Sequence, residues 1–72
     1  MKKVYRLEDL DCANCAAKME EGINKISGVI NATVSFMAQK LTIDAQEDRY
    51  DEIMKEVVKV IKKIEPDCEI IL

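Results

Sequence analysis

The chain has 72 residues, is 49% hydrophobic and 35% charged, and carries a formal charge of −3. A chain of this length forms one small domain that buries only about 60% of its unfolded surface, which leaves little room for a deep catalytic cleft. The lysines are scattered among acidic residues without a basic face, so nucleic-acid binding has no electrostatic support. These properties favour a monomeric binding module over an enzyme.

Targeting signals are not evident in the sequence. No apolar run approaches the roughly 20 residues that span a bilayer, and the residues after Met1-Lys2-Lys3 do not resemble a signal-peptide core. We therefore expect a cytosolic protein without direct membrane contact. The chain has three cysteines, an odd number, and in a reducing compartment a CxxC pattern indicates metal binding or redox chemistry rather than a structural disulfide.

The first half of the chain contains patterns typical of two strands and a helix. Residues 3–7 alternate like a short strand, and residues 8–13 are expected to form a loop. Residues 14–26 are expected to be helical because Met19, Ile23 and Ile26 follow helical spacing, and Ser27-Gly28 ends this helix. Residues 29–36 predict a strand whose apolar side is formed by Ile30, Ala32, Val34 and Phe36.

The second half predicts a hairpin partner, a long helix and a final strand. Residues 40–45 alternate, with Leu41, Ile43 and Ala45 directed inward, so they pair with the preceding strand through the turn at residues 37–39. Residues 48–65 predict a helix that Pro66 stops, and residues 67–72 predict a last strand. The apolar stripe of this helix consists of Ile53, Val57, Ile61 and Ile64, with Met54 and Val58 beside it.

The resulting order is β-α-β-β-α-β, which predicts an α+β fold of the ferredoxin-like type. Both helices must bury their apolar stripes against the same face of a four-stranded antiparallel sheet. This topology places the first βα loop, the hairpin turn and the last αβ loop at one end of the sandwich. We therefore expect residues 11–15 to lie close to residues 65–68.

Cys12 and Cys15 are the candidate metal ligands. They lie three positions apart where the strand pattern gives way to the helix pattern, so both thiols can face one small ion. Thiolates bind soft ions such as Cu(I) and Zn²⁺. The helix N-terminus favours a nearby anion, so we expect both thiols to be easier to deprotonate than free cysteine.

Asp11, directly before Cys12, favours divalent ions. The chain has no histidine, so carboxylates are its remaining strong metal ligands. Two thiolates already leave Cu(I) with a net negative charge, whereas they only neutralise a divalent ion, which then accepts a carboxylate at modest cost. The run Asp-Cys-x-x-Cys thus predicts Zn²⁺, Cd²⁺ or Pb²⁺ over Cu(I). The alternative is that Asp11 is the helix N-cap or a solvated loop acid.

Two further residues are candidates near the last loop. Glu65 either adds an oxygen ligand to a divalent ion or is simply solvated. Cys68 is either a further ligand or a small buried apolar residue, and burial tendencies favour the second interpretation. By their spacing, the apolar residues expected in the core also include Met19, Met54, Tyr5 and Phe36.

The chain resembles the heavy-metal-associated domain of copper chaperones and of the N-termini of soft-metal P-type ATPases. The segments that carry the resemblance are residues 7–20 (LEDLDCANCAAKME), 26–29 (ISGV) and 32–36 (ATVSF), with the closing helix and residues 65–67, so it extends over residues 1–72. It implies the ferredoxin-like fold and metal carriage by Cys12 and Cys15. Asp9 and Leu10 depart from the family pattern, which has glycine and methionine there.

Within that family, the chain is most similar to the N-terminal domain of zinc-, cadmium- and lead-exporting P-type ATPases, which have Asp where copper domains usually have a neutral residue. This resemblance implies a non-catalytic metal-binding module whose partners are the ion and other domains of a parent ATPase. A free-standing metallochaperone, including a Cu(I) carrier, is the alternative. A thiol-disulfide oxidoreductase is disfavoured, because the residue directly before Cys12 is not aromatic and the strand order differs from that of a thioredoxin core.

Overall fold

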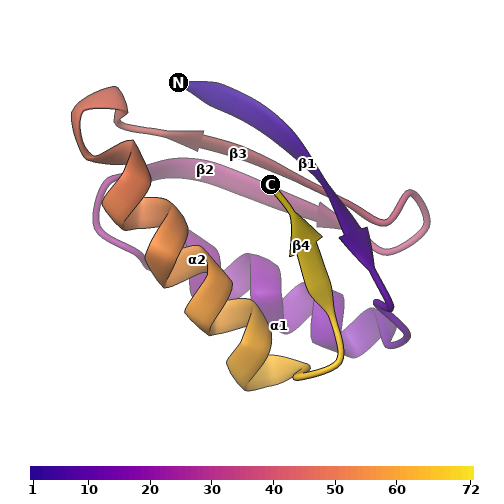
Figure 1. Cartoon of the computed structure of the whole chain (residues 1–72). Coiled ribbons are helices and arrows are strands. Elements are labelled where there is room, and N and C mark those ends of the chain that lie inside the picture. The colour runs from indigo at the N-terminus through magenta and orange to yellow at the C-terminus, as the bar shows by residue number, and fades with distance from the viewer.

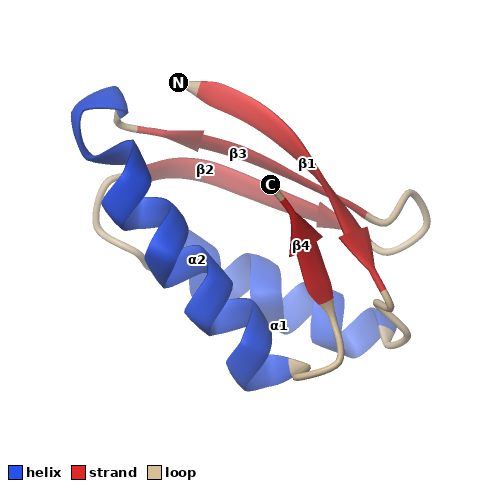
Figure 2. Cartoon of the chain, viewed as in Figure 1, coloured by secondary structure: helices blue, strands red, loops and turns tan.

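A computed structural model describes residues 1–72 and confirms the predicted ferredoxin-like architecture (Figure 1). The elements in chain order are β1 (Lys2–Glu8), α1 (Ala13–Asn24), β2 (Val29–Ser35), β3 (Lys40–Ala45), the 3-10 helix η1 (Glu47–Arg49), α2 (Tyr50–Ile64) and β4 (Glu69–Ile71). The sheet has the strand order β2-β3-β1-β4, and every neighbouring pair is antiparallel. The two α-helices cover the same face of this sheet (Figure 2).

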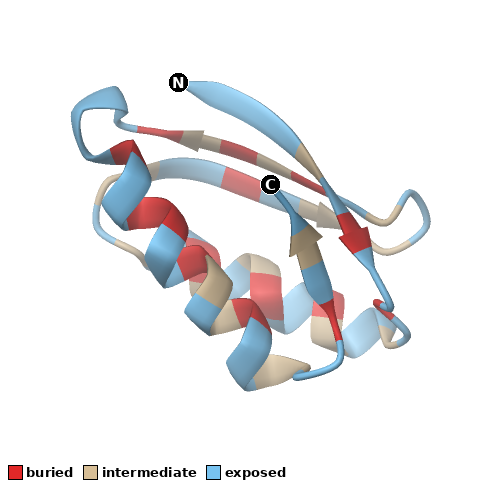
Figure 3. Ribbon diagram, in the orientation of Figure 1, coloured by how far each residue is buried: buried red, intermediate tan, exposed pale blue.

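The hydrophobic core lies between the helices and the sheet (Figure 3). Alternation on the strands and a repeat of 3.6 residues on the helices direct apolar side chains into this one layer. The exposed sides of the helices and the far face of the sheet carry most of the charged residues. The largest fully buried side chains are Leu7, Met19, Ile23, Leu41, Ile43, Ile53, Val57, Ile61 and Cys68.

Helix α1 is shorter than its sequence pattern predicted. It ends at Asn24 with Lys25 as its C-cap, so Ile26 packs against the core from the following turn. Gly28 in that turn has a φ of 97°, which strains any residue with a side chain. A Cβ at Gly28 would also lie 2.6 Å from Cδ1 of Ile53. Glycine is needed here because α2 packs directly over the turn.

Helix α2 begins two residues later than predicted, because the segment before it forms the short helix η1. Its buried residues are Tyr50, Ile53, Met54, Val57 and Ile61, which confirms most of the predicted stripe. Val58 and Ile64 are only half-buried at its margins. Acidic residues in its first turn and lysines in its last turn complement the helix dipole.

The prediction that Ile30 faces the core is wrong. Val29 pairs with Ala45 and Asn31 with Asp44, so Ile30 is the extra residue of a β-bulge between them. The bulge turns Ile30 outward, where it is 65% exposed, and Val29 takes the inward position. A bulge shifts the alternation of a strand by one residue, which a simple period of two does not reveal.

Side chains of α1 bond the free backbone edge of β2. The Asn24 side chain accepts a hydrogen bond from the Ala32 N–H at 2.8 Å and donates one to the Ala32 carbonyl at 2.9 Å. Glu20 Oε1 accepts a hydrogen bond from the Val34 N–H at 3.0 Å. An edge strand with unpaired backbone groups is a template for pairing with another chain, and these contacts occupy that edge.

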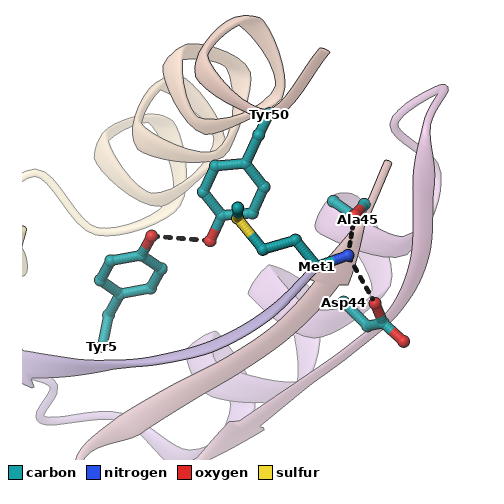
Figure 4. Close-up of polar contacts among 5 residues, drawn as sticks. All are labelled: Met1, Tyr5, Asp44, Ala45 and Tyr50. Atoms are coloured by element: carbon teal, nitrogen blue, oxygen red, sulfur yellow. Dashed lines mark hydrogen bonds and ion pairs between the residues drawn. The ribbon is translucent and has the colours of Figure 1, made fainter. Parts of the chain in front are cut away.

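A polar cluster closes the end of the molecule where β1 begins (Figure 4). The Tyr5 and Tyr50 hydroxyls are hydrogen-bonded at 2.6 Å, and the Met1 amino group donates to the Ala45 carbonyl at 2.7 Å and to Asp44 Oδ1 at 3.5 Å. Burial is the main cause that raises the pKa of Tyr50. Tyr5, predicted as a core residue, is only half-buried because its hydroxyl reaches this cluster.

Candidate metal site

Three connections meet at the opposite end of the sheet: the β1–α1 loop, the β2–β3 turn and the α2–β4 loop (Figure 1). The Leu10 N–H donates a hydrogen bond to Gln39 Oε1 at 3.2 Å, and the Asp11 N–H donates one to Glu65 Oε1 at 3.4 Å. These contacts link each of the other two connections to the loop that holds the cysteines. The predicted proximity of residues 11–15 and 65–68 is therefore confirmed.

Cys12 is the N-cap of α1. Its Sγ accepts a hydrogen bond from the Cys15 N–H at 3.2 Å, and its carbonyl accepts one from the Ala16 N–H at 3.1 Å. The sulfur thus occupies the place of the serine or aspartate oxygen that usually caps a helix. Asp11 is exposed and does not cap the helix, so one of the two alternatives considered for its carboxylate is removed.

Hydrogen bonding moves the pKa values of the two thiols in opposite directions. Hydrogen bonds from the side chain and backbone of Cys15 lower the pKa of Cys12, whereas the same side-chain hydrogen bond raises the pKa of Cys15 to about 11. The prediction that both thiols are easier to deprotonate is therefore wrong for Cys15. Removing its proton breaks the bond to Cys12 and places a second negative charge beside the first.

Glu65 lies just past the end of α2, and its carboxylate faces the cysteine loop. Its Oε1 accepts the long hydrogen bond from Asp11, while its Oε2 is buried without any hydrogen-bond partner. The negative charge of Glu65 contributes to raising the pKa of both Cys12 and Cys15. A buried carboxylate oxygen without a partner is costly, and a cation at the thiols would compensate that cost.

Cys68 is a core residue. It is fully buried just before β4, and its N–H donates a hydrogen bond to the Glu65 carbonyl at 3.0 Å. Burial is the main cause that raises the pKa of its thiol. These observations agree with the favoured interpretation of Cys68 as a small apolar residue, because a deprotonated sulfur is disfavoured in such surroundings.

The carboxylates of Asp11 and Glu65 lie in the loops around the two thiols, but the carboxylates and thiols do not converge on a common point. No three Asp, Glu or Cys side chains are gathered into a preformed ligand set. Cys12 and Cys15 are both half-buried, so an ion or an incoming thiolate can reach their sulfur atoms from solvent. Asp11 lies on the exposed side of the same loop.

Asp9 and Gln39 have left-handed backbones, with φ values of 60° and 55°. Aspartate tolerates this region better than most residues, which explains how a residue other than glycine occupies position 9. Gln39 was not recognised as part of the site from the sequence, because a single glutamine in a turn carries no motif. Its side chain nevertheless contacts the cysteine loop directly.

The fold and the two thiols at a helix N-terminus define a small metal-binding domain with ferredoxin-like architecture. A model of the heavy-metal-associated domain matches residues 4–68, and the chain belongs to that family. It is therefore a heavy-metal-binding module. None of its helices has the length and apolar character needed to cross a membrane.

Known proteins similar to this chain include metal-transporting ATPases. The chain is 38% identical over 66 residues to the cadmium, zinc and cobalt-transporting ATPase of Bacillus subtilis (strain 168), which covers 92% of this chain and 9% of that protein. The apo N-terminal domain of ZntA has a TM-score of 0.73 and 27% identity, covering 99% of this chain and 92% of that domain. The Cu(I)-loaded N-terminal domain of a potential copper-translocating P-type ATPase from Bacillus subtilis has a TM-score of 0.78 and 27% identity. This match covers 99% of the present chain and 84% of that domain.

Proposed function

We propose that residues 1–72 form a monomeric domain that binds Zn²⁺, Cd²⁺ or Pb²⁺ in the cytosol and belongs to a P-type ATPase that exports these ions. The observation that carries this proposal is the free carboxylate of Asp11. Because Cys12 caps the helix with its own sulfur, Asp11 has no capping role and is available to an ion. The similarity to a cadmium, zinc and cobalt-transporting ATPase supports the same conclusion.

The charge of the ligand set favours a divalent ion. Cys12 and Cys15 as thiolates bring two negative charges, which a divalent ion neutralises and Cu(I) does not. Asp11 can then turn inward to complete the shell of Zn²⁺, which accepts sulfur and carboxylate oxygen together. We include Glu65 as a further ligand, since its Oε2 is buried without a partner. We exclude Cys68, since its sulfur is fully buried in the core.

The exposure of the thiols suits transfer of the ion. Each half-buried sulfur is open to an incoming thiolate, so a receiving site can replace one ligand at a time. The chain binds and releases the ion, while the energy for transport comes from the other domains of the parent ATPase. Binding requires loss of the Cys15 proton, whose pKa is raised to about 11, so affinity falls as the pH is lowered.

The test is a competition titration of Zn²⁺, Cd²⁺ and Cu(I) on the reduced domain and on Asp11→Asn. Asp9→Asn is the matched control, since it removes the same charge two residues away and asparagine also accepts the left-handed backbone. We expect Asp11→Asn to weaken Zn²⁺ and Cd²⁺ by more than about tenfold, because even groups outside the ligand shell contribute about that much. Asp9→Asn and the affinity for Cu(I) should change much less.

Two outcomes would contradict the role of Asp11. Equal losses in Asp11→Asn and Asp9→Asn would mean that only the overall negative potential matters. Equal losses for Zn²⁺, Cd²⁺ and Cu(I) would mean that Asp11 supports the loop rather than the ion. A preference for Cu(I) that neither substitution changes would favour the second candidate function, a Cu(I) carrier, which the similarity to a potential copper-translocating ATPase supports.

A further inference from the structure

The Gln39 side chain forms hydrogen bonds with both backbone polar groups of Leu10, its N–H and its carbonyl, in the loop before Cys12. Its Nε2 donates to the Leu10 carbonyl at 2.8 Å, and its Oε1 accepts from the Leu10 N–H at 3.2 Å. The same Nε2 donates to the Phe36 carbonyl at 2.8 Å, inside its own turn. The side-chain amide therefore acts like a residue of a neighbouring strand, joining the β2–β3 turn to the loop before Cys12.

The backbone of Gln39 holds the other side of that loop. Its carbonyl accepts a hydrogen bond from the Leu7 N–H at 2.7 Å. Leu7 and Leu10 flank the left-handed residue Asp9, and both side chains are anchored in the core with 2% exposure. Gln39 thus fixes the loop on both sides of the left-handed residue Asp9, shortly before Asp11.

We propose that Gln39 is a positioning residue that sets the orientation of Asp11 and Cys12 toward the ion. This inference rests on the proposed function. Cys15 is held by α1 itself, whereas Asp11 and Cys12 depend on the path of the preceding loop. Ligands that are oriented before binding lose less conformational freedom when the ion arrives. The contribution of Gln39 is therefore largest for an ion that uses Asp11 in addition to the two thiols.

Two substitutions of Gln39 separate its hydrogen bonds from backbone strain. Gln39→Gly removes the side chain and fits a φ of 55° without strain. Gln39→Glu keeps the shape but removes the amide donors to Leu10 and Phe36. Gln46→Glu is the control for the change in net charge alone: Gln46 is exposed, follows β3 at the other end of the sheet, and undergoes the same substitution.

The experiment measures Zn²⁺, Cd²⁺ and Cu(I) affinities of these variants by chelator competition, with urea unfolding in parallel. We expect Gln39→Gly to weaken Zn²⁺ and Cd²⁺ by about tenfold or more, with a smaller loss for Cu(I). Gln39→Glu should lose less affinity, because its added negative charge near the site attracts the cation. Gln46→Glu should change these affinities by less than about twofold, because its distant charge is screened. Wild-type affinities retained in folded Gln39→Gly would overturn the inference while leaving the proposed function intact.

Amide hydrogen exchange of the wild-type apo protein tests the contact without any variant. The Leu10 N–H should be protected well above the rate of an unstructured amide, because its acceptor is Gln39 Oε1. Exchange of Leu10 at the unstructured rate would overturn the inference even if the variants failed to fold. Absence of divalent binding by the wild-type protein would overturn the proposed function and, with it, this role of Gln39.

Discussion

A single atom, the Cys12 sulfur, both caps α1 and serves as a proposed metal ligand. Its contact with the Cys15 N–H places an electron-rich sulfur at the positive end of the helix dipole. The hydrogen bond to the Cys15 side chain lowers the pKa of Cys12 further, at the expense of its partner. The apo protein therefore holds its two thiols as an unequal pair, in which Cys12 loses its proton first.

Substitutions of Cys12 should separate its two roles. Cys12→Ser keeps a capping oxygen but removes the soft ligand, so the domain should fold with nearly wild-type stability and lose tight binding of Cd²⁺. Cys12→Ala removes both, and we expect a further loss of about 1 kcal/mol in the free energy of unfolding. Urea unfolding and Cd²⁺ titration measure the two effects. Equal stability of the serine and alanine variants would contradict the capping role.

Among the elements, helix α1 has two roles. It carries the cysteines at its N-terminus, and it covers the edge of the sheet. One face of the helix buries Ala16, Met19 and Ile23 in the core. Asn24 and Glu20 bond the outer backbone groups of β2. The helix that presents Cys15 is thus bound to the sheet along its length, which keeps its N-terminus in place.

Asn24→Ala should destabilise the domain and expose the edge of β2. It leaves the N–H and carbonyl of Ala32 without their partner, and we expect a loss of about 1–3 kcal/mol in the free energy of unfolding. Asn31→Ala is the matched control, since Asn31 is exposed on the same strand. Urea unfolding and light scattering are the measurements. A loss of the same size in Asn31→Ala would show that the bonds of Asn24 are not its cause.

At the scale of the whole molecule, the polar cluster and the cysteine loop lie at opposite ends of the sheet. The hydroxyls of Tyr5 and Tyr50 meet at one end, and the proposed ligands gather at the other. The buried layer of the core separates them, and no hydrogen-bonded contact links them directly. We therefore expect stability and metal affinity to respond independently to changes at the two ends.

Tyr5→Phe tests this independence. It leaves the Tyr50 hydroxyl without its partner and should lower the free energy of unfolding by about 1 kcal/mol. The affinity of the folded domain for Cd²⁺ should stay at the wild-type value, because the loop contacts of Gln39 and Glu65 are untouched. Thermal unfolding and Cd²⁺ competition measure the two quantities. A parallel fall in affinity would mean that the two ends are coupled through the core.

The sequence by itself determined the order of elements, the buried stripes and the pairing of Cys12 with Cys15. These features are local, because strand alternation, helical spacing and the CxxC interval are each contained within one segment. The predictions from the sequence that were wrong concern features that are not local. The bulge at Ile30 and the shorter α1 depend on how the segments pack, and the opposite pKa shifts of the thiols depend on which of them caps the helix.

Only the tertiary structure decided what surrounds the two thiols. Gln39 lies 29 positions from Leu10, and Glu65 lies 54 positions from Asp11, so no sequence period connects them. The topology brings them together because the loops after β1, β2 and α2 emerge at the same end of the sheet. The two sulfur ligands could be predicted from the sequence. The buried oxygen of Glu65 and the amide of Gln39 become neighbours of the site only through folding.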